Sequence, residues 1–135
     1  MDAIDFRKPP ERGLGSNANG LYIIVGSAGT ILTSSNATTW TSVTNPSTTN
    51  LHGVAYGNGL FVTVGANGTI LISATASSWQ AQPSGVSLKL NSIAFANGTF
   101  VAVGEKGTIL TSSNALSWSQ LPVMNGVTLY AVTPY

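Results

Sequence analysis

The sequence predicts an all-β fold made of repeated antiparallel units, and three observations support this prediction. One stretch, Gly-Thr-Ile-Leu followed by a Ser/Thr/Asn-rich loop and a tryptophan, occurs three times, and Trp40, Trp79 and Trp118 lie 39 residues apart. A fixed period of this length indicates a repeat architecture. Each copy also holds short apolar runs rich in β-branched and aromatic residues, which are typical of buried strands. No segment shows the 3.6-residue apolar spacing of an amphipathic helix.

Each repeat contains four predicted strands. The first strand is found at Leu51–Tyr56 and again at Leu90–Phe95, each followed by an Asn-Gly hairpin signal. The second is an apolar run between glycines, at 20–26, 59–65 and 98–104. A tight turn follows, and its glycine supplies the positive φ that the turn needs; this residue is Gly29, Gly68 or Gly107. The Thr-Ile-Leu strand and a short strand carrying the tryptophan complete the unit, which describes one blade of a β-propeller.

The strand count predicts blades that are permuted by one strand. The segment 39 residues before Leu51, at 12–17, has no strand pattern, so we expect the first blade to lack a first strand of its own. At the other end, Leu129, Tyr130, Ala131 and Val132 match a first strand with no blade after it. The chain therefore divides into an extended N-terminal arm at 1–19 and a three-blade segment at 20–135, with repeats near 20–50, 51–89 and 90–128 and a C-terminal strand at 129–135 that completes a first blade.

Three blades are too few to close a ring, because propellers contain about 4–8 blades. An open arc exposes sheet edges and blade faces, which favour aggregation. Two chains give six blades, with the C-terminal strand of each chain completing the first blade of the other. We therefore favour a dimer; a trimer of nine blades and completion by a partner protein are the alternatives.

The repeat resembles the bacterial neuraminidase repeat, or Asp-box, family of sialidase-like propellers, whose loop reads roughly Ser/Thr-x-Asp-x-Gly-x-Thr-Trp. The stretch Thr33–Trp40 keeps the Ser/Thr, the second Thr and the Trp, but has Ser35 and Ala37 in place of the Asp and the Gly. The other copies have Ala74 and Ser113 at the Asp position. The resemblance implies a structural loop on the face opposite the ligand site, with the tryptophan packed between blades. Because the aspartate is missing here, we expect Ser, Thr and Asn side chains to hold this loop through hydrogen bonds.

The residues of the repeats do not favour an enzyme. The sialidases that share this repeat use an arginine cluster, acidic residues and a tyrosine, whereas the repeats here contain no arginine and one carboxylate, Glu105. His52 is the single histidine and there is no cysteine, so neither a nucleophile with its base nor a metal-ligand cluster is indicated. We expect no catalytic residue, no cofactor and no metal site.

Charge is concentrated in the N-terminal arm. Charged residues make up 7% of the chain, and six of the nine lie in the first twelve residues. We expect this arm to dock on a neighbouring subunit or a carrier protein through Phe6, Arg7, Lys8 and Arg12. The net charge of +1 does not indicate a nucleic-acid partner. No apolar run approaches the ~18 residues of a membrane span, and the N-terminus shows no signal-peptide pattern.

Three functions follow as hypotheses. The favoured one is a non-catalytic oligomeric propeller that serves as a structural or docking module on a larger assembly, such as a virion or phage surface. This fits an extracellular or particle-surface location, as does the uncharged Ser/Thr/Asn-rich surface. The alternatives are a multivalent glycan-binding lectin and an excised or designed fragment of a longer propeller. A ligand face would lie on the loops 41–50, 82–89 and 121–128, with the turns at Ala28, Asn67 and Lys106.

Overall fold

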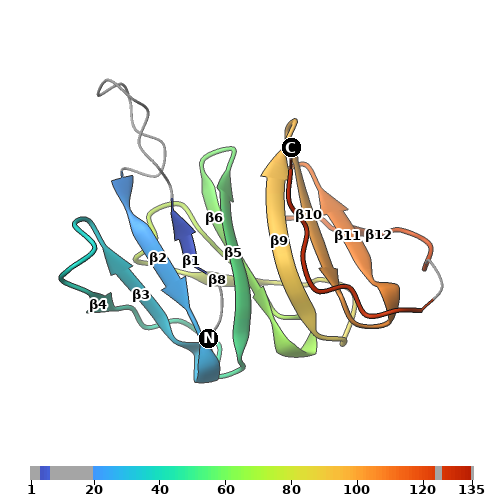
Figure 1. Ribbon diagram of the computed structural model, residues 1–135, viewed down its shortest axis with the longest axis horizontal. Coiled ribbons are helices and arrows are strands. Elements are labelled where there is room, and N and C mark those ends of the chain that lie inside the picture. Colours follow the sequence, from blue (N-terminus) through green and yellow to red (C-terminus); the bar gives the residue numbers. More distant parts are fainter. Residues whose placement is uncertain (1–3, 7–19, 124–125, 135) are drawn as a thin grey trace.

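The computed structural model describes residues 4–6, 20–123 and 126–134, and its strands form three four-stranded antiparallel sheets (Figure 1). The first blade contains β1 (Ile4–Phe6), β2 (Tyr22–Val25), β3 (Ile31–Ser34) and β4 (Thr41–Ser42). The second contains β5 (Leu51–Gly57), β6 (Leu60–Gly65), β7 (Ile70–Ser73) and β8 (Gln80–Gln82). The third contains β9 (Leu90–Ala96), β10 (Thr99–Gly104), β11 (Ile109–Ser112) and β12 (Ser119–Gln120). The described residues include no helix that could cross a membrane.

The strands of each blade pair in chain order, and the register repeats with the sequence. Ile24 pairs with Leu32, Thr63 with Leu71, and Ala102 with Leu110, each pair 39 residues after the last. The second and third strands of each blade are joined by copies of the same 3-10 turn, at η3 (Ser27–Gly29), η4 (Ala66–Gly68) and η5 (Glu105–Gly107). The all-β class and the three antiparallel blades predicted from the repeat are thus confirmed.

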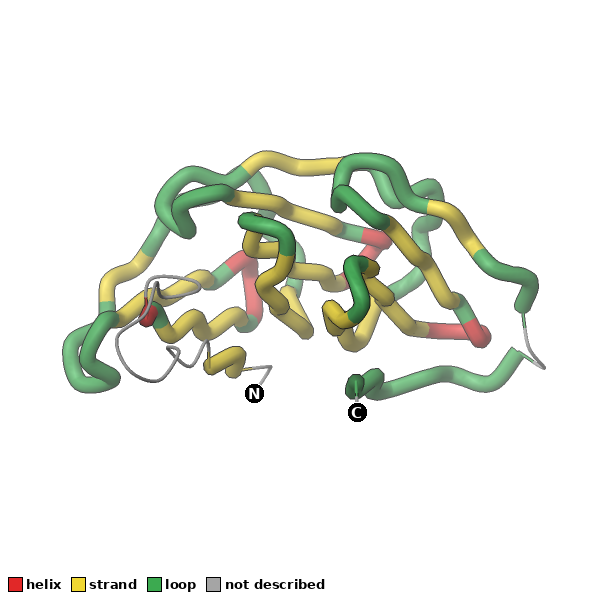
Figure 2. Tube along the Cα trace, turned by 90° about the horizontal axis from the view of Figure 1, so that it is seen from above, coloured by secondary structure: helices red, strands yellow, loops and turns green. Residues whose placement is uncertain are grey.

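The blades are arranged as an arc. Figure 2 shows the outer strands along its convex side and the inner strands toward the opposite, open side. The first strands of neighbouring blades lie side by side, β5 against β9 and β1 against β5. The main chain also joins blades at this inner position, because Leu51 N–H donates a 2.9 Å hydrogen bond to the carbonyl oxygen of Gly26 in the first blade. The arc therefore has the form of an incomplete propeller.

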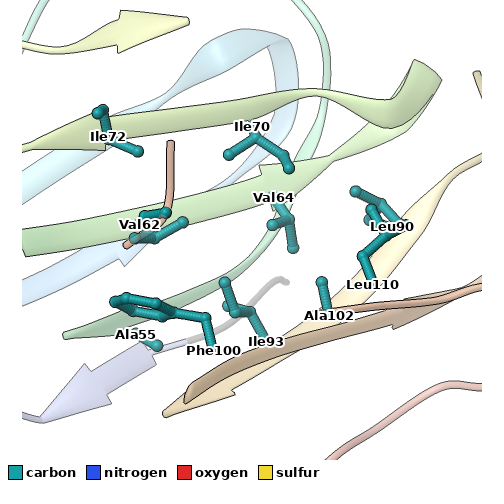
Figure 3. Packing of buried hydrophobic residues seen from close by; sticks show 11 residues of the cluster. Ala55, Val62, Val64, Ile70, Ile72, Leu90, Ile93, Phe100, Ala102 and Leu110 are labelled. Atoms are coloured by element: carbon teal, nitrogen blue, oxygen red, sulfur yellow. The ribbon is translucent and has the colours of Figure 1, made fainter. Parts of the chain in front are cut away.

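Two apolar cores lie between the blades. The core between the second and third blades is made by Val62, Val64, Ile70 and Ile72 on one side and by residues that include Phe100, Leu110 and Leu90 on the other (Figure 3). The core between the first and second blades is made by these residues: Ile23, Val25, Ile31, Leu51, Val54, Phe61, Leu71, Ala76 and Trp79. The strands β6 and β7 of the second blade are buried on both faces, because they lie between the two cores. This explains the near-continuous apolar runs of the repeats.

The first blade does not lack a first strand, which corrects one prediction. The strand β1 pairs with β2 in the register Ile4↔Ile24, Asp5↔Ile23 and Phe6↔Tyr22. Ile4-Asp5-Phe6 has the same order of branched, variable and aromatic residues as Val54-Ala55-Tyr56 in the second blade. Fixed 39-residue spacing misses this strand, because the segment between β1 and β2 is much longer than the Asn58-Gly59 turn of the second blade.

The C-terminal segment, residues 126–134, has no strand assignment and runs alongside β9, in dark red in Figure 1. Leu129 N–H donates a 2.9 Å bond to the carbonyl oxygen of Gly104, repeating the bond between Leu51 and Gly26 two repeats earlier. Asn91 Nδ2 donates to the carbonyl oxygen of Leu129 (2.8 Å), and Val132 N–H donates to Ser92 Oγ (3.2 Å). The segment therefore holds the first-strand position of a blade that would follow the third.

Candidate partner-binding face

At one end of the strands, all three blades carry a 3-10 turn, η3, η4 or η5, and the connections 43–50 and 83–89 lie beside these turns. We call this end of the blades the loop face. The turns are tight because two successive residues have positive φ, as at Ala28 (φ 54°) and Gly29 (φ 74°). A side chain on Gly29 would place its Cβ 2.1 Å from the carbonyl oxygen of Ser47, so only glycine allows the connection to lie this close. Gly68 and Gly107 take the same positive φ in the other two turns.

Side-chain hydrogen bonds fix the connection 43–50 to both neighbouring blades. Asn45 Nδ2 donates to the carbonyl oxygen of Gly29 (2.7 Å), and Asn50 Oδ1 accepts from Ala28 N–H (2.9 Å). The hydroxyls of Thr49 and Thr69 are 3.0 Å apart, which joins the connection to the second blade. The connection is therefore preorganised even though it has no regular secondary structure.

The connection 83–89 is also held by side-chain hydrogen bonds, one of which is made by the carboxylate of Glu105. Glu105 Oε1 accepts a 2.9 Å hydrogen bond from Lys89 N–H, and Ser84 Oγ contacts both the N–H and the carbonyl oxygen of Val86. The Glu105 side chain thus ties the third turn, η5, to the end of the connection 83–89. Its neighbour Lys106 has a positive φ of 57°, like Asn67 in the second turn.

A hollow of about 290 Å³ lies on the loop face, between the first connection and the second blade. Its lining is uncharged and consists of Pro46, Ser47, Thr48, Thr49, Thr69, Ile70, Leu71, Ala81 and Gln82. Hydroxyl and amide groups both donate and accept hydrogen bonds, as main-chain amides do. The hollow can therefore receive a neutral polar ligand such as a peptide segment or a sugar.

The Ser/Thr/Asn loops lie at the opposite end of the blades. Ser34 Oγ accepts hydrogen bonds from Asn36 and Ala37 N–H, and Asn36 Oδ1 accepts from Thr38 and Thr39 N–H (2.9 Å each). Ser112 and Asn114 repeat this pattern, while Ser73 and Thr75 make a reduced version. Polar side chains other than aspartate therefore hold these loops, as the sequence predicted.

The three tryptophans occupy equivalent positions with different surroundings. Trp79 is 6% exposed in the core between the first two blades, and its Nε1 donates to the carbonyl oxygen of Ala76 (3.0 Å). Trp118 makes the same bond to Ala115 and packs against the other core. Trp40 lies beside Tyr22, with ring centroids 6.4 Å apart, on the face of the first blade that has no blade before it.

In the part of the chain that the structure describes, the hollow is not lined by the predicted arm, by His52 or by the predicted closing strand. Phe6 is part of β1, whereas Arg7, Lys8 and Arg12 lie outside the described residues. His52 is half-buried on β5. Of the predicted closing strand, Leu129 and Val132 are half-buried, Ala131 is exposed and Tyr130 is 75% exposed. The described residues contain no group of three His, Cys, Asp or Glu side chains that could hold a metal ion.

Sequence reasoning did not single out the side chains that organise the hollow. Asn45, Ser47 and Thr49 alternate along the first connection, a spacing typical of turns in which a side chain accepts a hydrogen bond from an N–H two residues later. Two such bonds are formed, from Ser47 N–H to Asn45 Oδ1 (2.9 Å) and from Thr49 N–H to Ser47 Oγ (3.0 Å). The pairing with Thr69 could not be read from the sequence, because it joins two blades.

Comparison with known proteins supports the fold. No protein-family model and no curated protein sequence matches the chain, so membership of the Asp-box family is not shown. Among solved structures, "YCF48 bound to D1 peptide" is similar, with a TM-score of 0.65 and 18% sequence identity over 81% of this chain. The matched region is 38% of the YCF48 chain, so this chain spans less than half of that protein's length. YCF48 is a β-propeller, and this chain has the propeller fold.

Proposed function

We propose that this protein is a non-catalytic propeller module that binds partner proteins and assembles with copies of itself on a larger structure, such as a virion or phage surface. The observation that carries the proposal is the preorganised, uncharged hollow of the loop face. The similar structure of YCF48 was solved with a bound peptide, which supports a peptide or protein as ligand. The charged N-terminal arm is the proposed contact with a carrier protein, and the proposed location is extracellular or on a particle.

Self-assembly is proposed because the two blade faces left open at the ends of the arc carry residues equivalent to those that pack between blades. Val101 and Ile109 on the third blade are partly exposed, while the equivalent Val62 and Ile70 are buried by the next blade. On the first blade, Tyr22, Leu32 and Trp40 are partly exposed, while their equivalents in the second blade, Phe61, Leu71 and Trp79, are buried by the preceding blade. The open face of one copy therefore fits the opposite open face of a second copy, and two copies make six blades.

The binding role is tested by selecting peptides from a random library on the purified protein, followed by affinity measurements with two variants. Thr48 is exposed and lines the hollow, so Thr48→Arg should weaken binding of the selected peptides at least ~10-fold by steric obstruction. Thr38 is another exposed threonine, in a loop at the other end of the blades, and Thr38→Arg is the matched control. Peptides that bind both variants equally well would place the binding site elsewhere.

The lectin alternative is tested on the same two variants with a glycan array. Glycan signals that Thr48→Arg removes and Thr38→Arg leaves unchanged, together with a failure to select any peptide, would replace protein binding by sugar binding as the function of the hollow. Signals from neither library would refute the proposed ligand role of the loop face.

A further inference from the structure

Two segments of this chain fit one position in an assembled ring. The first is β1, which covers the inner edge of β2 within the same chain. The second is Leu129–Val132, which lies beside β9 at the first-strand position of a following blade. When a second copy follows the third blade, its first blade takes that place. The β1 strand of the second copy and the C-terminal segment of the first copy then meet at the same edge.

The repeat register shows that the two segments are equivalent residue by residue. Ile4 pairs with Ile24 as Val54 pairs with Thr63 in the second blade. Val132 lies two repeats after Val54, so its partner in the following blade is again the residue equivalent to Ile24. A single edge of β2 can pair with one strand, and the two segments therefore exclude each other.

The contacts favour the C-terminal segment in the ring. The strand β1 has three residues and three pairs with β2, whereas β5 and β9 have seven residues each. Leu129 aligns with Leu51 and Leu90, which are fully buried at the inner ends of their blades, and it makes the same hydrogen bond to the preceding blade as Leu51. Leu129 is only half-buried in the single chain, so pairing with another blade would bury more of it.

This inference rests on the self-assembly proposed above: we propose that β1 is a temporary first strand of the first blade. It covers the edge of β2 in the unassembled chain and is displaced by Leu129–Val132 of a second copy when the ring closes. A covered edge prevents pairing with unrelated chains before assembly. The exchange of equivalent strands between copies is a form of domain swapping. Ring closure and the release of β1 are thereby one event.

Disulfide trapping tests this exchange, and the chain is suited to it because it has no cysteine. Two single-cysteine chains, Ile24→Cys and Val132→Cys, are mixed, allowed to assemble and oxidised. The expected product is a covalent dimer on a non-reducing gel, because Cα atoms paired across a ladder lie within disulfide range. A chain carrying Ile4→Cys and Ile24→Cys should close its internal disulfide in the monomer fraction and leave both thiols free in the assembled fraction.

The control is a chain with Val54→Cys and Thr63→Cys, the same register pair inside the second blade, which should oxidise in both fractions. Mass measurement of each fraction separates two kinds of failure. An assembled fraction in which Ile4→Cys closes on Ile24→Cys and no covalent dimer forms would overturn the strand exchange while leaving self-assembly intact. A monomer at all concentrations would overturn self-assembly and the exchange together.

Discussion

The loops that precede the tryptophans allow a sharp test of backbone strain, because the same conformation occurs three times with different burial. Ala37, Ala76 and Ala115 have positive φ values of 68°, 70° and 64°. Ala37 is exposed, whereas Ala76 is 1% exposed and Ala115 is fully buried. Substitution of each alanine by glycine therefore removes the same strain, but removes a packed methyl group at only two of the three positions.

The magnitudes follow from these differences. The left-handed conformation costs an L-residue about 1–2 kcal/mol, and glycine loses about 0.5–1 kcal/mol more conformational entropy than alanine on folding. Ala37→Gly should therefore stabilise the fold by about 0.5–1 kcal/mol. A buried methyl contributes about 0.8 kcal/mol, so Ala76→Gly and Ala115→Gly should change the free energy of unfolding by less than about 0.5 kcal/mol.

The measurement is urea unfolding of the three variants and the parent chain, at one protein concentration so that assembly contributes equally. An Ala37→Gly variant no more stable than the parent chain would contradict the predicted relief of backbone strain. Equal shifts in all three variants would show that burial of the methyl groups has no energetic effect, contrary to the prediction.

Two further predictions concern the turns and the tryptophans. Gly29→Ala should destabilise the fold at least about 2 kcal/mol more than Gly20→Ala in urea unfolding. Both positions have positive φ, but only a Cβ at Gly29 would meet a neighbouring carbonyl oxygen. Equal effects would contradict the close contact with Ser47. Trp79→Ala should cost about 3–5 kcal/mol of stability in the same assay. Trp40→Ala should cost much less, because Trp40 is partly exposed, and should instead shift the measured mass of the protein toward that of a monomer. A Trp40→Ala protein that assembles like the parent would show that the open face of the first blade is not part of the interface.

Local sequence was sufficient for most of the blade structure. The Asn58-Gly59 turn, the glycines of the 3-10 turns and the short apolar runs act over a few residues, and the strands and their order follow from them. The polar loops were also predictable, because Ser34 and Asn36 bond to N–H groups two or three residues away. These features depend on short-range geometry, which the sequence expresses directly.

The first strand of the first blade could not be placed by the repeat spacing. Its pairing with β2 closes a loop much longer than a hairpin turn, and such a pairing is specified by the free edge of β2 rather than by neighbouring residues. Ile4-Asp5-Phe6 carries the pattern of a first strand, but three residues are a weak signal without a register to compare.

The sequence by itself determined the all-β class, the 39-residue blade, the order of the strands and the scarcity of charge in the repeats. Tertiary structure alone decided which strand covers β2, how the connection 43–50 joins two blades through Thr49 and Thr69, and where the uncharged hollow lies. The reason is physical: turns and strand patterns are encoded by residues close in the chain, whereas an edge, an interface or a hollow exists only where separate blades meet.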